Sequence, residues 1–226
     1  MQKPTLIVSC TTKKHFQDTL LHQSLSKIQT LTDFDTQWYC ENQMGLSKMY
    51  NAAFKDHAKN YERIVYIHDD VALDDAMLDS KLDDAMNNLN YDIVGLAGGL
   101  NPTIQHPALW HIMSKREHQR GYAGHLAHDG TKFMTGFGTT PARVAIVDGL
   151  FVAVNVAAAM QKNWQWNENF DFHHYDIASC IDANKCSMRV GVYPINVFHQ
   201  SPGLLSLDDV KWSASNKKFL QLYFQQ

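Results

Sequence analysis

The stretch Ile64-Val65-Tyr66-Ile67-His68-Asp69-Asp70-Val71 decides the fold class, because an apolar, β-branched run ends abruptly in a histidine and two acids. A short apolar run bounded by charge is typical of an interior strand in a parallel sheet. In open α/β sheets, ligands bind beyond the carboxyl ends of such strands. Acids placed there are costly to hold together without a compensating charge, such as a divalent cation carrying a phosphorylated ligand. The simpler alternative is that Asp69 and Asp70 open a loop and face water.

The first hundred residues alternate between strand-like and helix-like segments. Right-handed crossovers would place the loops after the first and third strands at one edge of the sheet, so we expect Thr11–Lys14 and His68–Asp70 to face one ligand. Ser47 is the expected N-cap of the second helix. The alternation is typical of a doubly wound parallel sheet with helices on both faces. The predicted strands cover 6–10, 36–40, 64–67 and 93–96, and the predicted helices cover 15–28, 47–57 and 75–89.

The second half is less regular. Residues 98–143 are rich in glycine and histidine, which indicates long loops and short hairpins over the carboxyl edge of the sheet. His199 stands just past the last predicted strand, and the tail that follows is amphipathic. We find no repeat or linker, so we expect an α/β fold with a mixed, mainly parallel Rossmann-like sheet in one domain over 1–226. The predicted elements are a bent strand or strand pair over 145–154, helices over 157–164 and 170–184, and a strand over 190–197.

Composition narrows the class of protein. The 226 residues are 45% hydrophobic and 19% charged, which fits a globular chain rather than a disordered one. A net charge of −3 argues against nucleic acid as the main partner. The sequence shows neither a signal peptide nor an apolar run long enough to cross a membrane. The four cysteines form no C-x-x-C pair, which favours reduced thiols in a cytoplasmic protein.

Five short motifs follow one another in an informative order. The chain resembles the nucleotide-sugar-dependent glycosyltransferases of the GT-A fold, most closely the family-2-like group that includes the streptomycin-biosynthesis glycosyltransferase-like domains. The resemblance covers roughly residues 5–200 and implies a nucleotide-binding half over 1–100, then an acceptor-binding half and tail over 101–226. The motifs are the segment 45–53, the strand ending in His68-Asp69-Asp70, Val147-Asp148-Gly149-Leu150-Phe151, the segment 171–177, and the strand ending in Phe198-His199.

The resemblance implies a metal site at the end of the third strand. GT-A enzymes carry an Asp-x-Asp motif there, which binds manganese or magnesium at the donor diphosphate; here the residues are His68-Asp69-Asp70. Asp70 is the best candidate ligand, and His199 matches a late histidine that completes the site in several families. His68 replaces the first acid, and an imidazole ligand favours manganese over magnesium. The alternative is that His68 only hydrogen-bonds the nucleotide.

The resemblance also implies catalytic residues. Asp176 matches the acid that serves as general base in many inverting members, although Tyr175 stands where the motif commonly has Glu. His174 is a competing base. Asp148, beside Gly149, matches the segment below the donor sugar and the acceptor and is a candidate for binding sugar hydroxyls.

Further residues match the nucleotide pocket. Thr11, Thr12 and Asn42 fall where the family holds the base and ribose, and Asn51 matches an asparagine that supports the pocket. Asp69 is expected to contact the ribose or the metal's water shell. Candidate cations for the phosphates are Lys13, Lys14 and Lys48, each of which is alternatively a solvated surface lysine.

The leading hypothesis is therefore a metal-dependent transferase that moves a sugar from a nucleoside diphosphate to a hydroxyl acceptor, such as a saccharide. Two alternatives remain open: a non-catalytic sugar-nucleotide binding protein, or a metallohydrolase using His68, Asp70, His173 and His199. A nucleotidyltransferase is less favoured, because the loop after the first strand lacks glycine. The aromatic tail leaves a peripheral membrane contact open.

Overall fold

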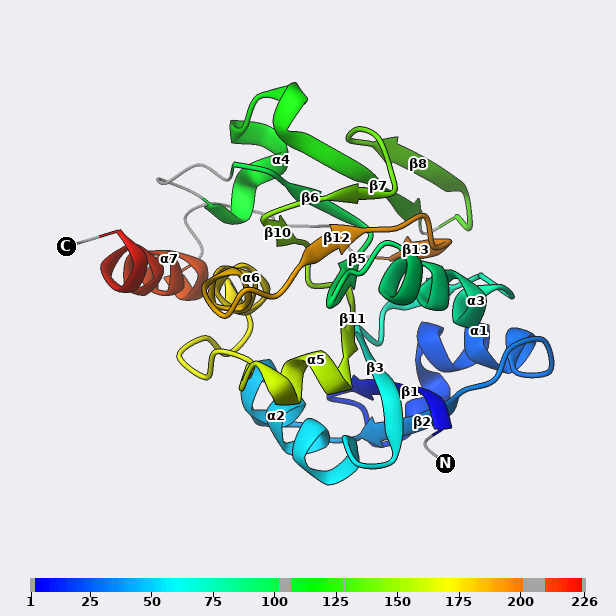
Figure 1. The fold of residues 1–226 in the computed structure, drawn as a ribbon. Helices are drawn as coiled ribbons and strands as arrows, with labels where there is room; N and C mark the ends of the chain where they lie inside the picture. Colours follow the sequence, from blue (N-terminus) through cyan, green and yellow to red (C-terminus); the bar gives the residue numbers. More distant parts are fainter. Residues whose placement is uncertain (1–2, 102–106, 128, 201–209, 225–226) are drawn as a thin grey trace.

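The computed structural model describes residues 3–101, 107–127, 129–200 and 210–224 as two β-sheets flanked by helices (Figure 1). The elements in chain order are β1 (Lys3–Cys10), η1 (Phe16–Asp18), α1 (Leu20–Ile28), β2 (Asp35–Tyr39), α2 (Leu46–His57), β3 (Tyr61–Ile67), β4 (Val71–Leu73), α3 (Leu78–Asp83), η2 (Asp84–Asn88), β5 (Ile93–Gly95), β6 (Ala97–Gly99), η3 (Pro107–Leu109), α4 (Trp110–Met113), η4 (Arg116–His118), β7 (Gln119–Leu126), β8 (Lys132–Gly136), β9 (Ala142–Arg143), β10 (Ile146–Val147), β11 (Phe151–Asn155), α5 (Val156–Gln161), α6 (Tyr175–Lys185), β12 (Val190–Val192), β13 (Val197–His199) and α7 (Val210–Tyr223).

The larger sheet confirms the mixed α/β architecture. Its strand order is β2-β1-β3-β11-β5-β12-β9. β1 pairs in parallel with both β2 and β3, and β12 pairs in parallel with β5. β11 is inserted antiparallel between β3 and β5, which separates two strands that are neighbours in the predicted alternation. The carboxyl ends of β1 and β3 therefore share one edge, as expected.

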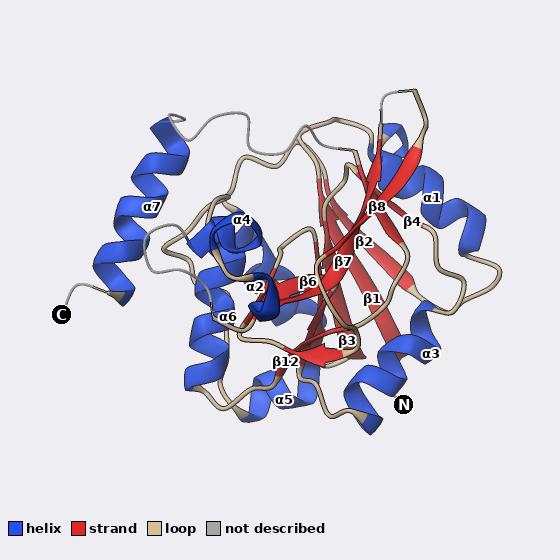
Figure 2. Ribbon diagram, turned by 90° about the horizontal axis from the view of Figure 1, so that it is seen from above, coloured by secondary structure: helices blue, strands red, loops and turns tan. Residues whose placement is uncertain are grey.

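Both faces of this sheet are buried, which explains the unbroken apolar runs. Successive side chains of a strand point to opposite faces. Leu6 and Ile64 accordingly pack with α2, α5 and α6 in one core, and Ile7 and Val65 pack with α1 and α3 in the other. Figure 2 shows these two groups of helices on either side of the strands.

The second sheet places His199 next to the end of β3. Its order is β10-β6-β7-β13-β4, with β8 on β7. Three residues, 68–70, separate the end of β3 from the start of β4 and form the junction between the two sheets. β13 pairs antiparallel with β4 and places His199 opposite Val71. The backbone N–H of Gln200 also donates to the carbonyl oxygen of Asp70 at 2.9 Å.

The strand predicted over 190–197 is two strands in two sheets, β12 and β13. Pro194 lies between them. Proline has no N–H to donate to a strand ladder, so it interrupts the pairing at this position. His199 is consequently the last residue of β13 rather than a residue beyond it.

Several helix starts also differ from the prediction, since α1 begins at Leu20, after the short η1, and α3 begins at Leu78. Gly45, not Ser47, is the N-cap of α2, and Ser47 is buried in the first turn. α6 begins at Tyr175 instead of residue 170, because His174 adopts a left-handed conformation with φ 65° that cannot continue a helix backwards.

Cys10, Cys40, Cys180 and Cys186 are free thiols. Over the part of the chain that the structure describes, none of the helices combines the length and apolarity that a membrane crossing requires.

Candidate active site

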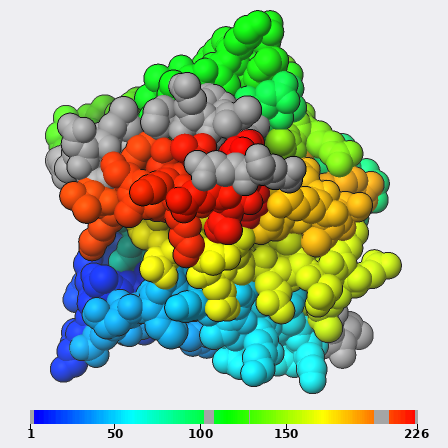
Figure 3. All heavy atoms as spheres, turned by 90° about the vertical axis from the view of Figure 1, so that its left-hand side faces the viewer, coloured from blue at the N-terminus to red at the C-terminus, as the bar shows by residue number. Residues whose placement is uncertain are grey.

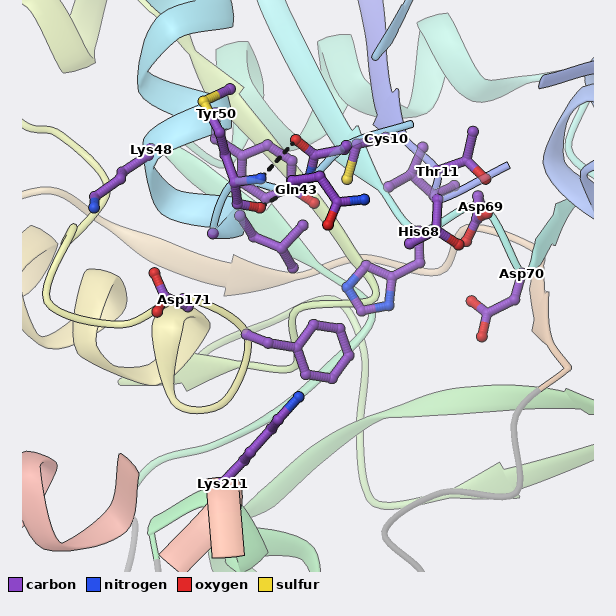
Figure 4. A pocket seen from close by; sticks show the side chains of 17 residues that line it. Cys10, Thr11, Gln43, Lys48, Tyr50, His68, Asp69, Asp70, Asp171 and Lys211 are labelled. Carbon is purple, nitrogen blue, oxygen red and sulfur yellow. Dashed lines mark hydrogen bonds between the residues drawn. The ribbon is translucent and has the colours of Figure 1, made fainter. Parts of the chain in front are cut away.

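A cavity of about 850 Å³ opens at the carboxyl ends of β1 and β3, as the sequence predicts (Figure 4). The loops after both strands line it, and so does the start of α2. The approach of α2 to its neighbour requires Gly45, since a Cβ there would lie 2.2 Å from Oδ1 of Asp171. The lining residues are Cys10, Thr11, Thr12, Asn42, Gln43, Met44, Gly45, Leu46, Lys48, Tyr50, Ile67, His68, Asp69, Asp70, Asp171, Phe172 and Lys211.

His68, Asp70 and His199 meet at one side of this cavity. One ligand atom from each lies within 4.8 Å of the other two. Nε2 of His199 is 3.1 Å from Oδ1 of Asp70, and the rings of His68 and His199 are 6.1 Å apart. The pairing of β13 with β4 brings His199 to this position, across more than a hundred residues of chain.

The charges in this cluster depend on one another. Burial opposes ionisation of Asp70, but the close approach and the charge of His199 outweigh it and lower the pKa of Asp70. Burial likewise opposes the charged form of His199, and Asp70 outweighs it and raises the pKa of His199. Burial lowers the pKa of His68, against the attraction of Asp70. His68 is therefore held as a neutral imidazole.

The cluster suits a divalent cation. Oδ1 of Asp70 is buried and has no hydrogen-bond donor in good geometry among the described residues, although Nε2 of His199 is close. A carboxylate with two imidazoles is a donor set that manganese accepts. The carboxylates of Asp69 and Asp171 also line the cavity, so an anionic ligand would meet repulsion there unless a cation accompanied it.

The predicted nucleotide residues divide into two groups. Thr11, Thr12, Asn42 and Asp69 all line the cavity. Asn51 does not: its side-chain amide donates to the carbonyl oxygen of Trp166 and accepts from the N–H of the same residue, both at 2.9 Å. Asn51 thus braces α2 against the segment that precedes α6.

Two further acids lie beside the metal-type cluster. Oδ2 of Asp176 accepts a hydrogen bond from the N–H of Gly149 at 2.8 Å, and Oδ1 accepts one from the N–H of Ile177 at 2.9 Å. Burial, and then the charge of Asp148, raise the pKa of Asp176 to about 7. Asp148 also raises the pKa of His199, so the two acids and the strand-end cluster lie within electrostatic reach of one another.

The sequence profile described as "Glycosyltransferase like family" matches residues 6–223. The chain belongs to this family. Its mixed sheet, with the cavity-lining loops at the carboxyl edge, agrees with the fold that the sequence predicts, and the finer streptomycin-type grouping stays a prediction.

Several solved structures have folds similar to that of this chain at low sequence identity. A197 from STIV is 14% identical, with a TM-score of 0.56 over 89% of this chain and 86% of that one. The catalytic domain of Drosophila β1,4-galactosyltransferase 7 in complex with xylobiose is 11% identical, with a TM-score of 0.49 over 84% of this chain and 64% of that one. The mannosyltransferase PcManGT from Pyrobaculum calidifontis, in complex with GDP-Man and Mn²⁺, is 10% identical, with a TM-score of 0.49 over 89% and 57%.

The chain spans less than two thirds of the length of the last two structures. No curated protein sequence matches it significantly.

His173, His174 and His199 are not among the residues that line the cavity, and of these three His199 belongs to the group with His68 and Asp70. His174 is 2% exposed, and its ring packs against Trp212 and Phe219 of α7. Nδ1 of His174 is 2.9 Å from Oγ of Ser215, and the same hydroxyl donates to the carbonyl oxygen of His173. Figure 3 shows α7, in orange and red, lying across this face of the molecule next to the yellow segment that precedes α6.

Three residues in or beside the cavity lining were not singled out from the sequence as functional. Lys211 reaches the cavity from α7, and Figure 4 shows its side chain pointing into it. Phe172 stacks on His68 with ring centroids 6.1 Å apart. Tyr175, noted only as a departure from the family motif, places its hydroxyl 2.9 Å from Nε2 of His68. No local pattern in the sequence predicts these contacts, because each joins distant segments of the chain.

Proposed function

We propose that the chain is a metal-dependent glycosyltransferase that transfers a sugar from a nucleoside diphosphate sugar to a hydroxyl acceptor, such as a saccharide. The observation that carries the proposal is the grouping of His68, Asp70 and His199 beside a cavity at the carboxyl ends of β1 and β3. Membership of the glycosyltransferase-like family supports the reaction class.

The donor would lie in this cavity, largely against the first hundred residues. Thr11, Thr12 and Asn42 offer hydroxyl and amide groups to the base and ribose, and Asp69 offers a carboxylate to the ribose hydroxyls. Lys211 enters the cavity from the second half and is a counter-charge for the diphosphate. Residues 101–226 would supply the acceptor side.

Asp70, His68 and His199 would hold the cation. A divalent ion bound there supplies Lewis-acid stabilisation to the departing diphosphate. The three residues present one carboxylate and two imidazoles, which adds little negative charge beside the phosphates. We favour manganese over magnesium because imidazole is a poor magnesium ligand.

Asp176, which lies outside the cavity lining, is the proposed general base, and its match to the acid that serves as base in many inverting family members favours inversion. Its raised pKa, about 7, matches a carboxylate that takes a proton near neutral pH. Asp148 would hold hydroxyl groups of the reacting sugars. Because His174 is covered by α7, we assign the proton transfer to Asp176.

Two alternatives make different predictions. A non-catalytic binding protein would bind donor and metal in the same cavity without transfer or hydrolysis. A four-ligand metallohydrolase would also need His173, which is absent from the grouping found among the described residues.

The testing experiment is a thermal-shift screen of UDP, GDP, CDP and TDP, each with and without Mn²⁺. A ligand that binds only the folded state raises the melting temperature. A rise that requires both one nucleotide and Mn²⁺ supports the proposal and identifies the donor class. A rise with zinc alone and with no nucleotide would replace the proposal by the metallohydrolase.

A further inference from the structure

His68, Tyr175 and Gly149 form a chain of hydrogen bonds beside the metal-type cluster. The Tyr175 hydroxyl is 2.9 Å from Nε2 of His68 and 2.8 Å from the carbonyl oxygen of Gly149. Tyr175 is 3% exposed, so water does not compete for these contacts. His68 follows the end of β3, Tyr175 is the first residue of α6, and Gly149 lies in the turn before β11.

The number of available protons determines which group donates in each of these two hydrogen bonds. A carbonyl oxygen only accepts, so the single hydroxyl proton of Tyr175 goes to Gly149. The other contact is then a hydrogen bond only if Nε2 of His68 carries the proton and donates it to the tyrosine oxygen. The reverse direction would leave two oxygens 2.8 Å apart with no proton between them.

The other ring nitrogen is therefore the one with a lone pair. Neutral imidazole has one protonated and one unprotonated nitrogen, so Nδ1 of His68 is free to act as a ligand. Figure 4 shows one ring nitrogen of His68 facing Asp70, and Nε2 is engaged by Tyr175. The lone pair of Nδ1 is thus directed toward the position that Asp70 and His199 also face.

The side chain of Tyr175 is packed tightly by its neighbours. A Cβ at residue 149 would lie 2.4 Å from its hydroxyl oxygen, so the contact depends on glycine there. The tyrosine ring packs on Tyr50 and Trp166, with centroids 5.9 and 5.8 Å away. The N–H of His68 donates to the carbonyl oxygen of Leu150 at 3.1 Å, which ties the histidine backbone to the same turn.

We propose that Tyr175 is a positioning residue that keeps the proton of His68 on Nε2 and so presents the lone pair of Nδ1 to a cation beside Asp70 and His199. The inference rests on the proposed metal site. It explains why a tyrosine stands at this place in the chain: its hydroxyl is the partner that orients a histidine ligand, the usual role of groups behind metal-binding imidazoles.

The position of the proton is measured by ¹⁵N NMR of the histidine rings in the metal-free protein, with the His68 signals assigned from a His68→Asn variant. We expect Nε2 to be protonated and Nδ1 unprotonated in the wild type. In Tyr175→Phe we expect a mixture of the two neutral forms. A wild-type His68 with its proton on Nδ1 would overturn the proposal.

The consequence for the metal is measured by titrating Mn²⁺ and recording its electron paramagnetic resonance. Loss of a group that orients a ligand typically weakens affinity about 10–100-fold, and we expect this range for Tyr175→Phe. Tyr66→Phe is the matched control, because Tyr66 is buried in the same aromatic cluster, 4.6 Å from the ring of Tyr50, and its hydroxyl donates to the carbonyl oxygen of Tyr50 at 3.5 Å. It should bind Mn²⁺ as the wild type does.

The two proposals fail in different ways. If Tyr175→Phe keeps the wild-type proton position or the wild-type Mn²⁺ affinity, the role of Tyr175 is refuted and the metal site stands. If the wild type binds no Mn²⁺ although its His68 proton is on Nε2, the metal site is refuted, and with it the purpose assigned to Tyr175.

Discussion

Two regions of this protein contain the same residue types and use them differently. At the strand-end cluster (His68, Asp70 and His199), polar side chains converge beside a cavity, and a buried carboxylate oxygen lacks a well-placed donor. At the helix seam (His173 and His174 against α7), the ring of His174 is covered by aromatic residues and lies within hydrogen-bonding distance of Ser215.

The comparison shows that neither residue type nor closeness to a motif decides a role. His174 is one residue from Tyr175 and two from Asp176, yet its partners lie on α7. His199 is far along the chain from Asp70, and a strand pairing brings them together. The two histidines differ in what surrounds the ring: His199 lies beside the carboxylate of Asp70, whereas His174 packs against another helix.

The largest effect is expected at Asp176. Replacement by Asn removes the base and should lower kcat about 10²–10⁴-fold, with donor binding retained. The measurement is steady-state transfer per folded molecule, with Tyr66→Phe as a buried control. Retained kcat in Asp176→Asn would contradict the assignment of the base.

The same residue gives a pH prediction. Burial raises the pKa of Asp176 to about 7, so the transfer rate should rise with pH through about 7. Since its folded-state pKa exceeds its unfolded-state pKa, the group's contribution to stability is present below about pH 4 and lost as the pH rises through about 7. Chemical denaturation across this range should show the loss in the wild type and a flatter profile in Asp176→Asn.

At the strand-end cluster, Asp70→Ala should abolish the Mn²⁺-dependent thermal shift and lower transfer about 10²–10³-fold, because charge stabilisation of the leaving group is lost. Asp33→Ala, at an exposed position outside the cavity, is the control. Full metal dependence in Asp70→Ala would show that the cation binds elsewhere.

At the helix seam, His174→Ala should destabilise the fold by about 2 kcal/mol, because it empties a buried ring position against α7. Transfer per folded molecule should be unchanged. Urea unfolding and kcat measured together test this prediction. A large loss of kcat at normal stability would show that His174 is a candidate general base.

The smallest effect is expected at Lys211. Lys211→Met should weaken nucleoside diphosphate binding about two- to five-fold, the range for a partly solvated ion pair, and weaken nucleoside binding less. Lys217→Met, at an exposed position of the same helix, is the matched control. Equal losses for nucleoside and diphosphate would show that Lys211 acts through α7 rather than on the phosphates.

Much of the fold could be predicted because its signals are local. The apolar run that ends in His68 and the alternation around it depend on side-chain periodicity, which a short window of sequence displays. The errors occur where one residue overrides the pattern: Pro194 divides the last predicted strand, and the backbone of His174 delays α6.

By itself, the sequence determined the doubly wound first half, the meeting of the loops after β1 and β3, and the candidacy of Asp70 and His199. Only the tertiary structure decided that His199 reaches Asp70, that Tyr175 engages His68, and that α7 covers His174 while delivering Lys211 to the cavity. The reason is physical: periodicity is fixed by neighbours in the chain, whereas these contacts depend on the pairing of β13 with β4 and on how helices pack across many residues.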